Sequence, residues 1–373
     1  MKTKIFFSIP LILVWLFFAT LFYKTIVLMI LFAIWKSYIV THIHIPMPVR
    51  KCSAKIIWAG LIICLWVGMP RYRIHNNDRV KLVYLDNEGN AKHPPLTHYV
   101  LNTLLPEAEI VNFTTKSLKF IKPIAQYMGI GNGMINQAQD DFDKGRRKNF
   151  LEPYHNLGLD NPISGVYPQL FNATLGTDNR TVYIIEPKHY DEDKSYPLVV
   201  FCHGYLGNWQ LYQGIWKSLN NCLVLSIGTR GLDGIFSVND IDQIFTYYLP
   251  TLKRMGYHID PQQIHLMGLS NGGTAIHAAM NSALAKDFKS LTTISCNLSN
   301  IRRVPCQVNL IGGGADNSAK LMPGQYRALK KNGVDTNIFF VEDENHFILV
   351  NRRTEILDFI QEKILKDAPE KDD

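Results

Sequence analysis

The sequence predicts an α/β protein with a mostly parallel sheet covered by helices on both faces, preceded by an apolar N-terminal region. Two observations carry this prediction. Between residues 181 and 366, short apolar runs alternate with longer helical stretches, which is typical of a buried parallel sheet. Before residue 70 the chain contains long uncharged runs, which are typical of membrane helices.

The N-terminal region, residues 1–70, contains three apolar runs. They cover residues 5–23, 25–35 and 56–70. A membrane helix needs about 20 apolar residues, and fewer when flanking lysines reach the interface. We therefore expect two to three transmembrane helices here. The alternative, a cleaved signal peptide, would contain a single apolar core.

Basic residues in this region account for the whole net charge of +7. Residues 1–69 contain seven Lys or Arg and no Asp or Glu, so the rest of the chain has 32 basic and 32 acidic side chains. This balance gives no support to a nucleic-acid partner.

The orientation in the membrane follows from the number of spans. Three spans from a cytoplasmic N-terminus place the remainder of the chain outside the cytoplasm, which is our expectation. Two spans would leave it inside, and the basic residues Arg71, Arg73, Arg79 and Lys81 favour that alternative.

Residues 71–180 form a predicted linker or extension of uncertain fold. Residues 79–85 are expected to form a short strand that ends at a turn cluster over 86–90. The glycine-rich segment 129–133 resembles a phosphate loop, but no Lys-Ser/Thr pair follows it, and we expect an ordinary loop.

Residues 181–366 form the predicted catalytic domain, and residues 367–373 form a polar tail. The expected strands cover residues 181–185, 198–202, 222–226, 264–267, 291–295, 306–311 and 336–341. The expected helices cover residues 209–219, 238–255, 274–286, 321–331 and 349–365. This alternation places reactive groups on loops at the carboxyl ends of the strands.

The segment Gly268-Leu269-Ser270-Asn271-Gly272 is the most informative motif. It follows an apolar strand and precedes a helix rich in small residues, as a nucleophile elbow requires. The turn strains the serine backbone, so small residues must stand two positions before and after it. Ser270 is therefore the candidate nucleophile.

Two later residues complete a candidate triad. Asp316 follows the strand at 306–311 and His346 follows the strand at 336–341, so the chain order is serine, aspartate, histidine. A neutral imidazole activates the serine hydroxyl, and a carboxylate fixes the imidazole tautomer. Asp343 and Glu344 are alternative acids, although neighbours in sequence rarely reach the correct ring nitrogen. We expect Asp343→Asn and Glu344→Gln to have little effect.

A His-Gly turn ends the strand at 198–202. Here the backbone N–H of Tyr205 is expected to form an oxyanion hole with that of Asn271. His203 precedes the nucleophile and is interpreted as a brace for this loop rather than as a base.

The cysteines predict neither a metal site nor a redox site. Cys202, Cys222 and Cys306 fall in expected strands, where free thiols pack as small hydrophobic groups. The sequence contains no C-x-x-C pair. We predict no cofactor and no metal.

Together, the His-Gly loop, Ile259-Asp260-Pro261, the serine elbow and the late Asp and His resemble the α/β-hydrolase superfamily. They are most similar to dienelactone-hydrolase-like and polyhydroxybutyrate-depolymerase-like esterases. The resemblance covers residues 181–366. It implies Ser270 as nucleophile, Asp316 as acid and His346 as base, with Tyr205 and Asn271 at the oxyanion hole.

The expected function is that of a membrane-anchored serine hydrolase. It would cleave carboxylic esters, either small or polymeric, through an acyl-enzyme, and its other partner would be the lipid bilayer. The alternatives are a non-catalytic scaffold that keeps the fold, and a peptidase or acyltransferase that uses the same triad.

Overall fold

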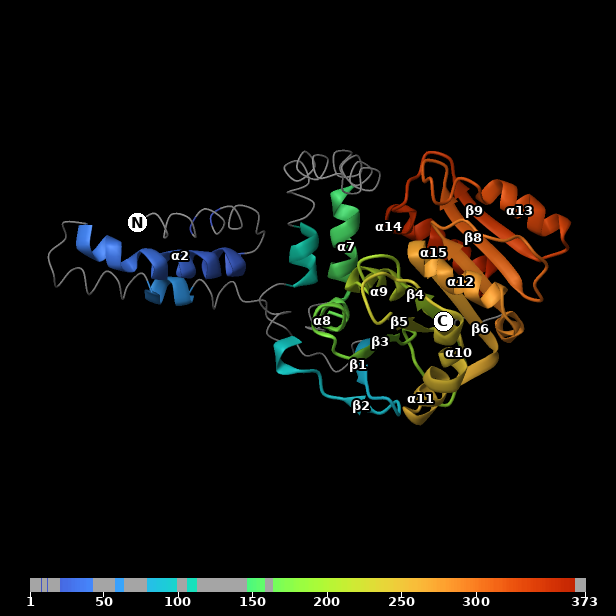
Figure 1. The fold of residues 1–373 in the computed structure, drawn as a ribbon, viewed down its shortest axis with the longest axis horizontal. Helices are drawn as coiled ribbons and strands as arrows, with labels where there is room; N and C mark the ends of the chain where they lie inside the picture. Colours follow the sequence, from blue (N-terminus) through green and yellow to red (C-terminus); the bar gives the residue numbers. More distant parts are fainter. Residues whose placement is uncertain are drawn as a thin grey trace. The chain divides into compact units, whose positions relative to one another are not determined.

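The computed structural model divides into two compact units. The first comprises Met1–Ile74 and Leu104–Lys144, and the second comprises His75–Thr103 and Gly145–Asp373. The described residues are 8, 12, 21–42, 58–63, 79–98, 106–112, 146–157 and 164–365. Helix α2 lies in the first unit, and the whole sheet lies in the second (Figure 1).

The first unit contains helix α2 (Leu21–His42), which includes the apolar run at 25–35. The ring of Phe32 meets that of Trp58 edge to face, with centroids 5.6 Å apart. Since Trp58 begins the helical residues 58–63, this contact joins the second and third apolar runs. Trp35 also donates a hydrogen bond to the Ser8 hydroxyl (2.6 Å).

The predicted membrane spans are not supported by the described residues. Among these residues, no helix combines the length and the apolar character that a membrane crossing requires. The run at 5–23 lies almost entirely outside the described residues, and only 58–63 of the third run is described. The predicted loop at 129–133 also lies outside them.

The second unit is built on one nine-stranded sheet with strand order β2-β1-β3-β5-β4-β6-β7-β8-β9. The strands are β1 (Val80–Leu85), β2 (Ala91–Lys92), β3 (Arg180–Ile185), β4 (Tyr196–Cys202), β5 (Leu223–Ile227), β6 (Ile259–Leu269), β7 (Ser290–Ile294), β8 (Gln307–Gly313) and β9 (Thr336–Val341). All seven strands predicted between residues 181 and 341 are present, and so is the short strand predicted at 79–85.

Six neighbouring strands, from β5 to β9, run parallel, as predicted. The sheet also extends beyond the predicted catalytic segment 181–366, because β1 pairs antiparallel with β3, and β3 pairs antiparallel with β5. This strand order, together with the strand–turn–helix at Ser270, is that of the α/β-hydrolase fold.

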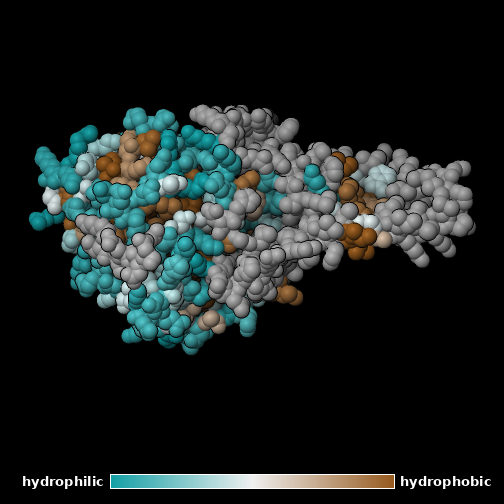
Figure 2. Space-filling view, turned by 180° about the vertical axis from the view of Figure 1, so that it is seen from behind, coloured by the Kyte–Doolittle hydropathy of each residue, from teal (hydrophilic) through white to brown (hydrophobic). Residues whose placement is uncertain are grey.

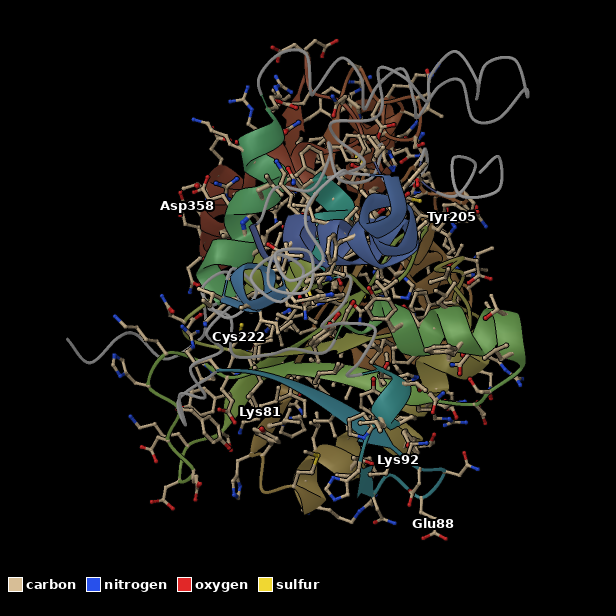
Figure 3. All side chains as sticks on the ribbon, turned by 90° about the vertical axis from the view of Figure 1, so that its left-hand side faces the viewer. Lys81, Glu88, Lys92, Tyr205, Cys222 and Asp358 are labelled. Atoms are coloured by element: carbon tan, nitrogen blue, oxygen red, sulfur yellow. The ribbon has the colours of Figure 1, made fainter. Side chains whose placement is uncertain are left out.

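The exposed edge of the sheet is formed by β1 and β2 and carries charged side chains. Figure 3 shows Lys81, Glu88 and Lys92 together on this side of the unit. Lys81 forms an ion pair with Glu186, the residue that follows β3. Charges on an edge strand oppose pairing with another chain, so they protect this edge.

Helices cover both faces of the sheet. They are α7 (Arg147–Leu157), α8 (Val166–Leu175), α9 (Gln210–Trp216), α10 (Val238–Gln243), a π-helical turn (Ile244–Tyr248), α11 (Leu249–Arg254), α12 (Gly273–Met280), α13 (Met322–Lys331), α14 (Ile348–Asn351) and α15 (Arg353–Lys363). The five helical stretches predicted after residue 208 are present, some of them divided into shorter segments.

Alternate side chains of β4 pack on opposite faces of the sheet. Leu198, Val200 and Cys202 pack into the core cluster with side chains of α10, α12 and α13. On the other face, Phe201 meets Trp216 of α9 with ring centroids 5.0 Å apart. Because both faces are buried, the central strands read as continuous apolar runs rather than as alternating ones.

The order of the central strands determines where a site can form. β4 lies between β5 and β6, so the chain reverses direction across the sheet at this point. Ligands in open α/β sheets bind outside the carboxyl ends of the strands at such a reversal. Here those ends are Cys202 on β4 and Gly268 on β6, which are paired in register.

Candidate active site

Ser270 lies on a tight turn between β6 and α12. Its backbone has φ +52°, in the left-handed region that a side chain other than glycine seldom adopts. A Cβ on Gly268 would collide with the Gly272 carbonyl, and a Cβ on Gly272 would collide with the Cys202 carbonyl. Glycine is therefore required at both positions, as the motif predicts.

The hydroxyl of Ser270 reaches His346, and His346 reaches Asp316. Ser270 Oγ lies 2.8 Å from His346 Nε2, and His346 Nδ1 lies 2.9 Å from Asp316 Oδ2. A carboxylate only accepts hydrogen bonds, so Nδ1–H donates to Asp316, and Nε2 is free to accept the Ser270 proton. The structure thus brings together the three residues that the sequence selected.

These residues come from the carboxyl ends of three strands. Ser270 follows β6, Asp316 follows β8 and His346 follows β9. Asp316 is buried, and its Oδ1 accepts a hydrogen bond from the backbone N–H of Ser318 (2.9 Å). This second bond fixes the plane of the carboxylate, and so the direction in which His346 is held.

Glu344 has a different role from the one considered in the sequence. Its carboxylate is 1% exposed and accepts hydrogen bonds from Arg146 (3.0 Å), Arg352 (2.9 Å) and Asn351 (3.2 Å). Its backbone carbonyl accepts a hydrogen bond from Ala315 N–H, next to Asp316. Glu344 therefore anchors the histidine loop to the aspartate turn, while Asp343 is exposed at the surface.

Ser295 is a site residue that sequence reasoning missed. It is buried at the end of β7 with φ +52°, and its hydroxyl donates to the backbone carbonyl of His346 (3.0 Å). Its own N–H donates to Ile311 on β8 (2.8 Å). The sequence shows only a serine at the end of an expected strand, so neither the conformation nor the partner could have been predicted.

The loop after β4 lies directly against Ser270. A Cβ placed on Gly204 would lie 3.1 Å from Ser270 Cβ and 3.7 Å from its Oγ. Tyr205 follows with its side chain at the surface, where Figure 3 labels it. The Asn271 side chain donates a hydrogen bond to the Asp233 carbonyl (2.8 Å), which ties the residue after Ser270 to the loop that contains Asp233.

His203 is buried within this loop and does not contact Ser270. Its Nδ1 lies 2.7 Å from the Gly204 carbonyl, and its Nε2 accepts a hydrogen bond from Thr229 N–H (3.1 Å). Burial lowers the pKa of His203 to about 4, so the imidazole is neutral near pH 7. These contacts agree with its interpretation as a brace.

The four cysteines of this unit, Cys202, Cys222, Cys296 and Cys306, are free thiols. Cys202 and Cys222 are fully buried, and burial raises the pKa of the Cys222 thiol to about 12. Within the described stretches, no group of three His, Cys, Asp or Glu side chains could hold a metal ion.

Comparison with known proteins gives structural likeness only. No protein-family model and no curated protein matches the sequence. An acylaminoacyl peptidase of Pyrococcus horikoshii has 18% identity and a TM-score of 0.39, over 52% of this chain and 41% of its own. A thermostable esterase has 18% identity and a TM-score of 0.39, over 49% of this chain and 59% of its own.

The esterase 2 of Thermogutta terrifontis, phosphonylated by cyclosarin, has 15% identity and a TM-score of 0.42. The likeness covers 52% of this chain and 92% of that one. This chain therefore spans less than half of the peptidase's length and most of the length of this esterase. Likeness at this level assigns no activity to the chain.

The first prediction separates the acids near His346. Asp316→Asn should slow the reaction of Ser270 with a fluorophosphonate probe by a factor on the order of 10⁴, because the amide favours the wrong tautomer of His346. Asp343→Asn, at an exposed position, is the matched control and should react as the wild type does. Equal loss in both variants would contradict the assignment of Asp316.

Glu344→Gln should behave differently from both. It should lower the free energy of unfolding by about 1–3 kcal/mol, because buried hydrogen bonds to charged groups are weakened. This expectation replaces the one drawn from the sequence alone, and urea unfolding measures it.

The second prediction concerns pH. The pKa of His203 is about 4 in the folded chain and about 6.5 in the unfolded chain, so the unfolded state binds more protons in between. The stabilising contribution of neutral His203 should be fully present above pH ~6.5. As the pH falls toward ~4, the free energy of unfolding should decrease by up to about 3 kcal/mol. Urea unfolding across this range should show a smaller decline for His203→Gln, and an unchanged decline would refute the assignment.

Proposed function

We propose that this protein is a serine hydrolase that cleaves carboxylic esters. The observation that carries the proposal is the continuous hydrogen-bonded series of Ser270, His346 and Asp316, with the serine on a strained turn. The likeness to dienelactone-hydrolase-like and polyhydroxybutyrate-depolymerase-like esterases belongs to the same proposal.

In the proposed reaction, Ser270 Oγ attacks the ester carbonyl while its proton moves to His346 Nε2. Asp316 stabilises the imidazolium that forms. The backbone N–H groups of Tyr205 and Asn271 would donate to the oxyanion, and one such donor contributes on the order of 10²–10³ in turnover. His346 then protonates the leaving alkoxide, and water activated by the same imidazole hydrolyses the acyl-enzyme.

An ester with an apolar group suits the surroundings of Ser270. Three large apolar side chains lie exposed on the adjacent loops: Tyr205 (53%), Leu206 (48%) and Ile235 (57%). The loop of Ile235 packs on the Gly204 carbonyl through Gly234, and its next residue, Phe236, donates to Thr274 on α12 (2.8 Å). The loops that carry these side chains therefore pack beside Ser270.

The third prediction tests the nucleophile. Ser270→Ala should lower the hydrolysis of p-nitrophenyl esters by a factor on the order of 10⁴–10⁶ and abolish labelling by a fluorophosphonate. Its unfolding curve should match that of the wild type, because only a hydroxyl is removed. Retention of a substantial part of the activity would exclude Ser270 as the nucleophile.

The same assay distinguishes the alternatives. A peptidase on this triad would also cleave acyl-anilides, which an esterase would leave intact, and an acyltransferase would pass the acyl group to an added alcohol. A non-catalytic scaffold would not react with the probe at all.

We also propose that residues 1–70 attach the chain to a membrane and that the hydrolase unit faces away from the cytoplasm. The three apolar runs and their flanking basic residues support attachment. In the described part of this region, large apolar side chains such as Leu28, Ile30, Ile62 and Ile63 lie exposed, and hydrophobic surface is visible in Figure 2.

The fourth prediction follows. The full chain should remain in the membrane pellet after carbonate extraction, whereas a version lacking residues 1–70 should leave the pellet. Protease added outside intact cells, with any outer layer permeabilised, should digest the hydrolase unit if three spans are present. Digestion only after lysis would favour two spans and a cytoplasmic hydrolase.

A further inference from the structure

One buried amide side chain connects α8 to both ends of the loop after β4. Gln169 is 1% exposed, and its Oε1 accepts a hydrogen bond from Asn208 N–H (2.7 Å). Its Nε2 donates to the Thr229 carbonyl (3.1 Å) and lies 2.8 Å from His203 Nε2. Exchanging the amide oxygen and nitrogen would set acceptor against acceptor at Thr229, so these partners fix the orientation of the amide.

Two glycines make room for this amide. A Cβ on Gly207 would lie 2.7 Å from Gln169 Oε1, and a Cβ on Gly228 would lie 2.8 Å from its Nε2. Gly207 also has φ +102°, which favours glycine. The loops after β4 and β5 are therefore shaped around the side chain of Gln169.

The amide and the Thr229 backbone N–H together determine which nitrogen of His203 carries the proton. Gln169 Nε2 and Thr229 N can only donate, so His203 Nε2 must accept from both. The proton of the neutral imidazole is therefore on Nδ1, which donates to the Gly204 carbonyl (2.7 Å).

This hydrogen bond orients the peptide beside the nucleophile. In a trans peptide the N–H of Tyr205 points opposite to the carbonyl of Gly204. Because that carbonyl is held toward His203, the Tyr205 N–H is turned away from the ring. Gly204 itself packs against Ser270, so the direction of this peptide decides whether its N–H can serve the oxyanion.

We propose that Gln169 is a positioning residue for the oxyanion hole, acting through the tautomer of His203. This inference rests on the proposed hydrolase function. Gln169 lies outside the segment 181–366 that sequence motifs identify, so α8 becomes part of the catalytic unit. A hydrolase domain that begins at residue 181 would lack this residue.

The test compares two buried amides on the same helix. Gln169→Leu should lower kcat by a factor of about 10–10² with KM changed less than about twofold, since a misplaced oxyanion donor affects the transition state more than substrate binding. Asn172 is the matched control, because its side chain bonds only to Thr177 and Asn179 in the turn after α8. Asn172→Leu should lower stability while leaving kcat unchanged.

Gln169→Glu gives a readout that loss of structure would not produce. The introduced carboxylate accepts rather than donates, so His203 can keep its bond to Gly204 only as an imidazolium. The activity of this variant relative to the wild type should therefore increase as the pH falls. A ratio that is constant with pH, or equal losses of kcat in Gln169→Leu and Asn172→Leu, would overturn the proposal.

The tautomer can be measured without any activity. Nitrogen chemical shifts of histidine should show His203 protonated at Nδ1 in the wild type near pH 7, and protonated at Nε2 as well in Gln169→Glu. A wild-type His203 protonated at Nε2 would refute this inference even if the protein hydrolyses esters. Conversely, the expected shifts in a protein that neither hydrolyses esters nor reacts with a fluorophosphonate would contradict the proposed function alone.

Discussion

The close contact between the elbow and the end of β4 is the constraint on which the rest of the site depends. Gly272 packs so tightly on the carbonyls of Cys202 and His203 that a single methyl group would not fit. The parallel register of β4 and β6 sets this distance, because it pairs Cys202 with Gly268. Ser270 and the loop after β4 are consequently held together by close backbone packing.

The two histidines of this site, His203 and His346, have different surroundings. His203 is fully buried among neutral donors and acceptors, so burial holds it in the uncharged form. His346 has the carboxylate of Asp316 at one nitrogen and the hydroxyl of Ser270 at the other. Only His346 therefore has a ring nitrogen that can take the proton of Ser270 and a carboxylate, that of Asp316, to stabilise the resulting imidazolium.

Several residues outside the triad hold its members in place. Ser295 and Glu344 fix the loop of His346, one through a hydroxyl just after β7 and the other through a carboxylate held by Arg146 and Arg352. Gln169 does the same for the loop after β4. Arg146 and Gln169 precede the first strand of the predicted catalytic segment, which shows that the region before residue 181 contributes to the site and does not merely connect domains.

The sequence by itself determined the parallel sheet, the elbow and the order of Ser270, Asp316 and His346. These features depend on local patterns: apolar runs long enough for buried strands, and glycines at the two positions where the turn leaves no space. Local patterns also placed Asp316 and His346 after the carboxyl ends of strands, where the reactive groups of a parallel sheet lie.

Only the tertiary structure showed the different partners of the two buried carboxylates and revealed the supporting residues. Asp316 and Glu344 are both buried carboxylates near His346. Asp316 bonds to the imidazole ring, whereas Glu344 bonds to Arg146 and Arg352. The contacts of Gln169 and Ser295 join segments that lie 34 and 51 residues apart in the chain. No periodicity or motif records such contacts, because they arise from the order in which distant strands pair and from the space that their neighbours leave.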